Sequence, residues 1–98
     1  DDDLLISYAD EQLRELEEYE KKHPGYVELL KSYIKNDRSL EKTAAELYLH
    51  RNTVNYRINK LKNLLQSPLK TVDDLFPLQI ALAIRDMESG LSSLDKMH

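Results

Sequence analysis

Apolar side chains recur along the 98-residue chain at intervals of three and four positions, the spacing that gathers them on one face of a helix. The pattern is clearest over residues 26–35, where Val27, Leu30 and Ile34 share a face. No alternating β-branched run exceeds a few residues, and only two glycines and three prolines interrupt the chain. The pattern predicts an all-α fold.

The first helix is predicted over residues 11–22. Asp10 is a suitable N-cap, and the His-Pro-Gly sequence at residues 23–25 ends the helix, because proline cannot continue the hydrogen-bond ladder. A second helix is predicted from Tyr26 to about Lys35. The opening LLIS, residues 4–7, is too short to assign, and it is either a strand remnant or a packing segment.

The next two predicted helices are joined by only three residues. Ser39 is a good N-cap for a helix over residues 40–47, and a break at residues 48–50 precedes a fourth helix that ends near Leu65. Such a pair predicts a helix-turn-helix over residues 39–65. Small residues are expected where the helices cross, at Ala44 and Ala45. The fourth helix has one apolar stripe that is expected to face inward: Val54, Ile58, Leu61 and Leu65.

The remaining residues predict a connector and one more helix. Residues 69–77 are the connector, with one helical turn begun by Thr71, and the last helix runs from about Pro77 to Glu88 with Gly90 as its C-cap. This helix is apolar nearly all round, which is typical of burial in a core or in a subunit interface. We therefore expect one compact domain over residues 1–90, with about five helices, and a flexible tail over residues 91–98.

Composition excludes several classes of protein. The chain has no cysteine, so it has no disulfide framework, thiolate metal site or cysteine nucleophile. No nucleophile–base pair, paired carboxylates or metal-ligand spacing stands out, so we expect neither an enzyme nor a cofactor. No apolar run approaches the roughly 18 residues of a membrane span, and no membrane partner is expected. Because the chain opens with Asp1 rather than methionine, we expect it to be part of something longer.

The net charge of −4 conceals a strong asymmetry. Residues 1–20 contain nine carboxylates and only one basic residue, Arg14. Residues 47–72 contain five basic residues and no acid. Because charges act within about a Debye length, ~8 Å at physiological salt, the local excess matters more than the sum.

A helical wheel shows where the basic residues of the fourth helix lie. With Val54 at zero, the other stripe residues fall within about 40°, whereas Asn52, Asn59 and Tyr56 lie roughly 140–200° away and Asn55 near 100°. Cations flank these amides on both sides, with Arg51 and Lys62 on one side and Arg57 and Lys60 on the other.

This face suits the major groove of double-stranded DNA. Asparagine can bond adenine N6 and N7 together, and cations meet phosphates, which sets affinity and register. The predicted base-reading residues are Asn52, Asn55, Tyr56 and Asn59, with the first two preferred because the start of a recognition helix enters the groove most deeply. The predicted phosphate contacts are His50, Arg51, Thr53, Arg57, Lys60 and Lys62.

Simpler interpretations stay open at this point. A basic helix face is often only a solvated surface, Tyr56 can seal the edge of the core, and His50 can be a turn residue or helix cap. Tyr48 occupies a turn position that often takes glycine. A left-handed backbone costs tyrosine roughly 1 kcal/mol, so the turn is either shaped differently or slightly strained. The apolar last helix also fits an alternative function, a helical interaction or dimerisation module without DNA binding.

The sequence SLEKTAAELYLHRNTVNYRINKLKNLL, and above all its HRNT-x-x-YR core (residues 50–53, 56 and 57), resembles the C-terminal helix-turn-helix of PucR-type regulators, which act in purine and sugar-diacid metabolism. The resemblance implies a bacterial cytoplasmic transcription factor that binds operator DNA as a homodimer, with an effector-sensing region elsewhere in the full-length protein. It also implies a DNA-facing role for His50, Arg51, Asn52, Thr53, Tyr56 and Arg57. Asn55 departs from the family pattern, in which many members have a basic residue there.

Overall fold

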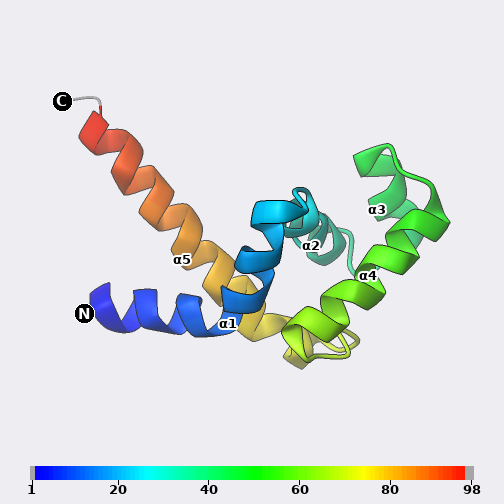
Figure 1. Cartoon of the computed structure of the whole chain (residues 1–98), viewed down its shortest axis with the longest axis horizontal. Coiled ribbons are helices and arrows are strands. Elements are labelled where there is room, and N and C mark those ends of the chain that lie inside the picture. Colours follow the sequence, from blue (N-terminus) through cyan, green and yellow to red (C-terminus); the bar gives the residue numbers. More distant parts are fainter. Residues whose placement is uncertain (1, 97–98) are drawn as a thin grey trace.

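The computed structural model describes residues 2–96, and the side chains of residues 3–90, as a bundle of helices that measures 44 × 27 × 25 Å (Figure 1). The described part contains five helices: α1 (Asp2–Lys22), α2 (Tyr26–Lys35), α3 (Leu40–Leu47), α4 (Arg51–Leu65) and α5 (Val72–Lys96). None of them is both long enough and apolar enough to cross a membrane. The predicted all-α class is confirmed, and so is the number of helices.

Helix α1 begins at Asp2 rather than after Asp10, so the strand interpretation of residues 4–7 was wrong. These residues are helical and exposed, not packed. The reason is that Ala9, Leu13 and Leu16 form one buried face that lies on both sides of Asp10 in the sequence. This face packs along α5, so the helix continues through Asp10. Asp10 does not act as a cap, since its carboxylate accepts a hydrogen bond from Arg85.

Helix α5 begins at Val72, before the predicted start at Pro77. Thr71 and Asp74 form a reciprocal cap: the Thr71 Oγ1 accepts from the Asp74 N–H at 3.1 Å, and the Asp74 carboxylate accepts from the Thr71 N–H at 3.0 Å. Pro77 lies inside the helix, where its missing N–H leaves the carbonyl of Asp73 without a helical donor. The predicted end near Glu88, with Gly90 as C-cap, was also wrong, because α5 continues to Lys96, and residues 91–96 of the expected tail are helical. Residues 97 and 98 of the expected tail lie outside the described residues.

The core lies where α4 crosses α1 and α2, with α5 packed along α1. Three of the four predicted stripe residues of α4 are buried, namely Val54, Ile58 and Leu61, and Leu65 packs at the edge. Leu69 is also fully buried, at 1% exposure, although the sequence placed it in a connector. The core therefore extends beyond the helices into the loop between α4 and α5.

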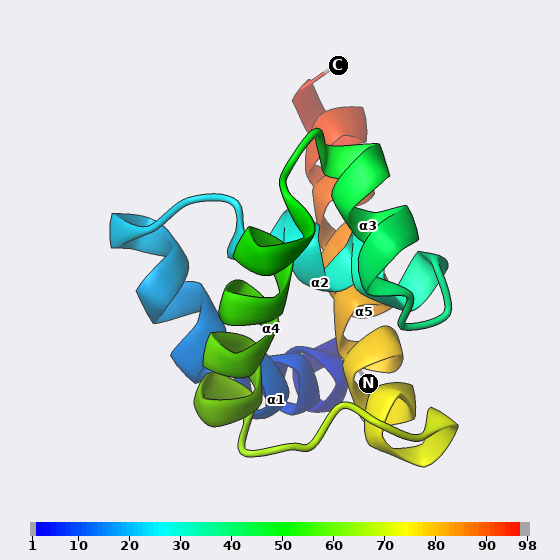
Figure 2. The same cartoon turned by 90° about the vertical axis from the view of Figure 1, so that its right-hand side faces the viewer.

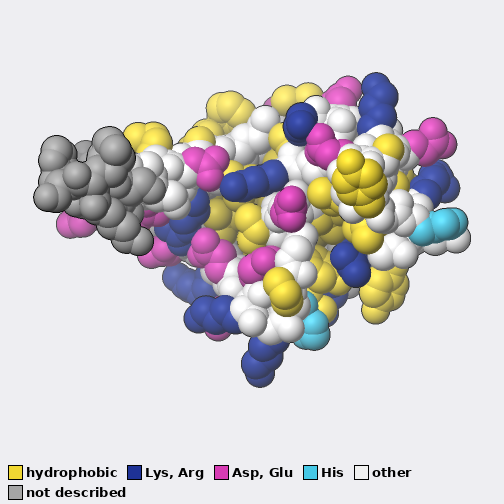
Figure 3. All heavy atoms as spheres, turned by 90° about the horizontal axis from the view of Figure 1, so that it is seen from above, with side chains coloured by type: hydrophobic (Ala, Val, Ile, Leu, Met, Phe, Trp, Pro, Cys, Tyr) yellow, Lys and Arg dark blue, Asp and Glu magenta, His cyan; other side chains and the backbone are white. Residues whose placement is uncertain are grey.

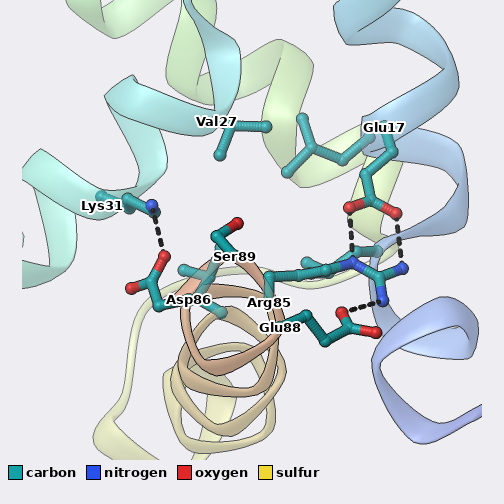
Figure 4. A pocket seen from close by; sticks show the side chains of 10 residues that line it. Glu17, Val27, Lys31, Arg85, Asp86, Glu88 and Ser89 are labelled. Atoms are coloured by element: carbon teal, nitrogen blue, oxygen red, sulfur yellow. Dashed lines mark hydrogen bonds and ion pairs between the residues drawn. The ribbon is translucent and has the colours of Figure 1, made fainter. Parts of the chain in front are cut away.

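Ion pairs fix α1 and α2 to α5 (Figure 4). The guanidinium of Arg85 donates to both carboxylate oxygens of Glu17 at 2.8 Å, to Glu88 at 3.0 Å and to Asp10. These hydrogen bonds, that to Glu17 foremost, raise the pKa of Arg85. Lys31 of α2 pairs with Asp86 of α5 at 3.1 Å. Helices α1, α2 and α5 are thus braced together, and α4 packs against α1 and α2.

Candidate nucleic-acid interface

Helices α3 and α4 form the predicted helix-turn-helix. Ser39 caps α3, since its hydroxyl accepts from the Lys42 N–H at 3.1 Å. Tyr48 then adopts the left-handed conformation, with φ 57° and ψ 41°, and the Leu49 N–H returns to the Ala44 carbonyl at 2.9 Å. Of the two alternatives for this turn, the strained one is therefore correct, and the turn holds a tyrosine in a backbone conformation that favours glycine.

The crossing of α3 and α4 differs from the prediction by one residue. Ala44 is buried as expected, but Ala45 is exposed, so its assignment to the crossing was wrong. Thr43, at 0% exposure, lies inside instead. At 100° per residue, three adjacent side chains cannot all face one partner helix, and the two that face inward are 43 and 44. The Thr43 hydroxyl has no hydrogen-bond partner within the described part of the chain.

His50 is the N-cap of α4. Its Nδ1 accepts a hydrogen bond from the Asn52 N–H at 3.0 Å, so the interpretation of His50 as a helix cap is confirmed. A nitrogen that accepts carries no proton, which leaves the ring proton on Nε2 and makes that atom a donor. The imidazole is exposed, so this donor is available to an external acceptor.

The amide-bearing face of α4 is open to solvent. Asn52, Asn55 and Asn59 are exposed, and their side chains make no hydrogen bond within the part of the chain that the structure describes. Tyr56 is 73% exposed, which excludes the interpretation that it seals the core. Figure 2 shows α4 in front, with α3 on one side and the C-terminal end of α1 on the other. No part of the described chain covers this face.

The cations beside this face differ in their surroundings. Arg51 is exposed, and Lys62 is half-buried on the same side of α4. On the other side, the Arg57 guanidinium lies 5.9 Å from the ring centre of Tyr26, and the Lys60 ammonium lies 4.8 Å from that of Tyr19. Thr53 is half-buried at the start of the helix. Aromatic rings therefore hold two of the predicted phosphate contacts in place.

These aromatic supports were not predicted from the sequence. Tyr19 and Tyr26 stand on either side of the loop at residues 23–25, and their rings meet edge to face at 5.0 Å. Burial, followed by the hydrogen bond with Tyr19, raises the pKa of the Tyr26 hydroxyl. The sequence did contain a signal for these supports, a tyrosine on each side of the tight loop at residues 23–25. Such a loop brings the ends of α1 and α2 together and with them the two rings.

A hollow of about 290 Å³ lies between α1, α2 and α5 and is separate from this face. Its floor is apolar, with Leu13, Leu16 and Leu82, and the Arg85 and Lys31 ion pairs stand at its rim (Figure 4). Both rim cations are already paired, so they offer a ligand no free charge. On the face seen in Figure 3, acidic and basic side chains are interspersed, unlike the acid-free surface of α4.

Comparison with known proteins places the chain in a family. The model of the PucR C-terminal helix-turn-helix domain matches residues 26–84. The chain is 30% identical over 77 residues to the DNA-binding transcriptional activator AdeR of Bacillus subtilis (strain 168), a match that covers 78% of this chain and 18% of that protein. It is 31% identical over 85 residues to the purine catabolism regulatory protein of the same organism, covering 87% of this chain and 16% of that protein.

The matched part of the chain thus spans less than a fifth of the length of these curated relatives. No solved structure matches it significantly. The resemblance read from HRNT-x-x-YR is confirmed, since the family match contains that motif within residues 26–84. The family is one of helix-turn-helix domains of transcriptional regulators and not a class of enzymes. The chain belongs to the PucR C-terminal helix-turn-helix domain family.

Proposed function

We propose that this chain is the sequence-specific DNA-binding domain of a bacterial transcriptional regulator, with α4 as the recognition helix in the major groove. One observation carries the proposal: α4 presents exposed amides between two rows of cations, and residues 47–72 contain no carboxylate. Membership of a family of regulator domains supports it, as does the likeness to AdeR, a DNA-binding transcriptional activator.

In this proposal the amide-bearing face of α4 reads the bases. Asn52 and Asn55 lie in the first turns of α4, where a recognition helix enters deepest, and Tyr56 and Asn59 continue the face. A carboxamide that has no partner inside the protein is free to bond both N6 and N7 of adenine. The ring of Tyr56 can pack on a thymine methyl group.

In this proposal residues at the start of α4 and along its two flanks contact the phosphates. The Nε2 of His50 and the hydroxyl of Thr53 lie at the helix N-terminus, which favours an anion. Arg51 and Lys62 reach one strand, and Arg57 and Lys60 the other. These contacts set affinity for every sequence alike, because they do not touch base edges.

We propose that the domain binds DNA as a homodimer through an apolar surface of α5. The α5 stripe (Val72, Phe76, Ile80, Ala83 and Met87) repeats at spacings of four and three, over about 22 Å of helix. Val72, Phe76 and Met87 are 58–64% exposed, and nothing in the described part of the chain covers them. For such a dimer to bind one duplex, its two copies of α4 must lie about 34 Å apart, the separation that fits successive major grooves.

In this proposal the rest of the regulator lies outside the 98 residues. The matches cover only 18% and 16% of the two relatives, which leaves room for an effector-sensing region. DNA as the partner places the regulator in the bacterial cytoplasm. No cofactor is needed, because readout rests on side chains alone.

The second candidate is a helical interaction or dimerisation module without DNA binding of its own. The exposed α5 stripe favours it, since such a surface fits a protein partner. The two candidates differ in one respect. The first requires that the α4 face bind a duplex, whereas the second leaves that face free.

Selection of bound sequences from random duplexes tests the proposal and supplies the site. If about three of the four cations of each subunit neutralise a phosphate, a dimer should bind with a log–log salt slope of roughly −5. Arg57→Gln should weaken binding to all sequences alike. Asn52→Ala should relax the choice at one base pair, by about 1–3 kcal/mol. Failure to enrich any sequence, with association of the purified domain retained, would favour the second candidate.

A further inference from the structure

The C-terminal end of α1 lies beside the exposed face of α4, on the side opposite α3 (Figure 2). Side-chain contacts join the two helices there. The Tyr19 ring contacts the Lys60 ammonium at 4.8 Å and stacks on the His23 ring at 4.3 Å. One ring therefore holds a proposed phosphate contact of α4 together with an exposed histidine just beyond α1.

The charge of α1 changes sign at this end. Its outer face carries Glu11 and Glu15 in the earlier turns, and then Lys21 and Lys22 in the last one. Lys21 pairs with Glu18 at 3.1 Å. Lys22 is exposed and forms no ion pair within the described part of the chain. The last turn of α1 thus offers one free cation, and the turns before it repel a polyanion.

The start of α2, which faces the same loop, is not available to a phosphate. Glu20 already occupies it: its carboxylate accepts from the N–H groups of Gly25, Tyr26 and Val27 at 2.8–2.9 Å. This internal anion satisfies the donors that an external anion would use. Contact with DNA here must come from side chains.

We infer that Lys22 and His23 form a second contact with the DNA backbone, on phosphates beside the groove that α4 enters. The inference rests on the proposed function and extends it from α4 to α1. Lys22 supplies the charge, and His23, held by Tyr19, supplies a ring N–H donor. The contact is confined to the last turn of α1, because Glu11 and Glu15 would meet the same phosphates farther along the helix.

Lysines in the last turn of a helix also stabilise the helix itself, so stability and binding must be measured separately. The test uses the 98-residue chain and the duplex recovered by selection, with binding measured from about 50 to 200 mM salt. The variant is Lys22→Gln with His23→Gln. Arg14→Gln is the matched control, because Arg14 is an exposed cation of the same helix, two turns before Lys22.

The double variant should bind roughly tenfold more weakly, and its salt slope should be smaller by about 0.9 per protomer, the signature of one lost phosphate contact. The weakening should be equal for specific and non-specific duplexes. The control should match the wild type. An unchanged affinity and slope in the double variant, while Arg57→Gln still weakens binding, would overturn the inference and leave the proposed function standing. A wild-type chain that binds no duplex would overturn both.

Discussion

The Nδ1 of His50 accepts a hydrogen bond from the backbone N–H of Asn52 at 3.0 Å, which joins the first and third residues of the HRNT motif. This bond satisfies one of the free N–H groups at the start of α4. It also fixes the orientation of the imidazole, so that Nε2 points away from the helix. One residue thus starts α4, the proposed recognition helix, and offers a donor beside it.

Two substitutions of His50 should separate these roles. His50→Ala removes the cap and should lower the free energy of unfolding by about 0.5–2 kcal/mol. His50→Asn restores a side-chain acceptor and should recover most of that loss, because asparagine is among the best N-caps. Both variants lack the Nε2 donor, so both should bind DNA more weakly. Urea unfolding and duplex titration measure the two effects, and full binding by His50→Asn would contradict the phosphate role.

Substitution of Tyr48 by glycine should raise the free energy of unfolding, whereas substitution of His50 by alanine should lower it. Its left-handed backbone disfavours any residue with a Cβ atom, and its side chain is 94% exposed and so contributes little packing. Tyr48→Gly should therefore raise the free energy of unfolding by roughly 0.5–1 kcal/mol. Tyr48→Ala is the control, since it removes the ring but keeps the strain and should gain nothing. Loss of DNA binding in both variants, with the fold intact, would reveal that the ring contacts DNA.

The features that sequence analysis predicted correctly depend on local chemistry. Ser39 and His50 have the side chains that caps require, and the spacing of Val54, Ile58 and Leu61 specifies the buried side of α4 whatever it packs against. The exposed amides follow from the same wheel. For these reasons the helix-turn-helix and the positions of its face were predictable from residues 39–65 alone.

The errors concern features that distant residues decide. Asp10 has the side chain of a cap, but Arg85, far along the chain, engages it. The start of α5 is an exception: Pro77 resembles the first residue of a helix, but the nearby Thr71 and Asp74 cap α5 earlier through a local contact. The placement of Arg57 and Lys60 over tyrosines requires α1 and α2 to come together at their loop. No periodicity within one helix contains that information.

The cap of α5 predicts a dependence of stability on pH. Hydrogen bonds from the backbone of Thr71 and then of Lys70 lower the pKa of Asp74. A lowered pKa in the folded state means that Asp74 stabilises the fold above the ordinary aspartate pKa of about 3.9, and that this contribution is lost as the pH falls through the folded value. Asp74→Ala should therefore be less stable than the wild type at neutral pH.

The stability difference between Asp74→Ala and the wild type should shrink below about pH 4, which urea unfolding across a pH series can measure. Asp73→Ala is the control, because Asp73 is an exposed neighbour in the same helical turn. A difference between wild type and Asp74→Ala that stays constant down to pH 2 would show that the carboxylate charge contributes nothing to the cap.

Arg85 is the residue whose loss should affect the support of α4 most. Its side chain is only 23% exposed, and its guanidinium lies among the carboxylates of Asp10, Glu17 and Glu88. Arg85→Met keeps the aliphatic packing but leaves three carboxylates close together. We expect the free energy of unfolding at neutral pH to fall by about 1–3 kcal/mol, less than for a fully buried pair because solvent screens the site.

The pH dependence of the stability of Arg85→Met distinguishes repulsion between the carboxylates from other causes. When the pH is lowered from about 7 to 5, protons taken up by the clustered carboxylates relieve their repulsion, so Arg85→Met should recover part of its loss relative to the wild type. Lys31→Met is the comparison. It removes the ion pair between Lys31 and Asp86, whose side chains are 45% and 67% exposed, and it should change the free energy of unfolding by less than about 1 kcal/mol. A deficit in Arg85→Met that is the same at both pH values would mean that repulsion between the carboxylates does not cause it, and that the lost hydrogen bonds of the guanidinium or its packing do.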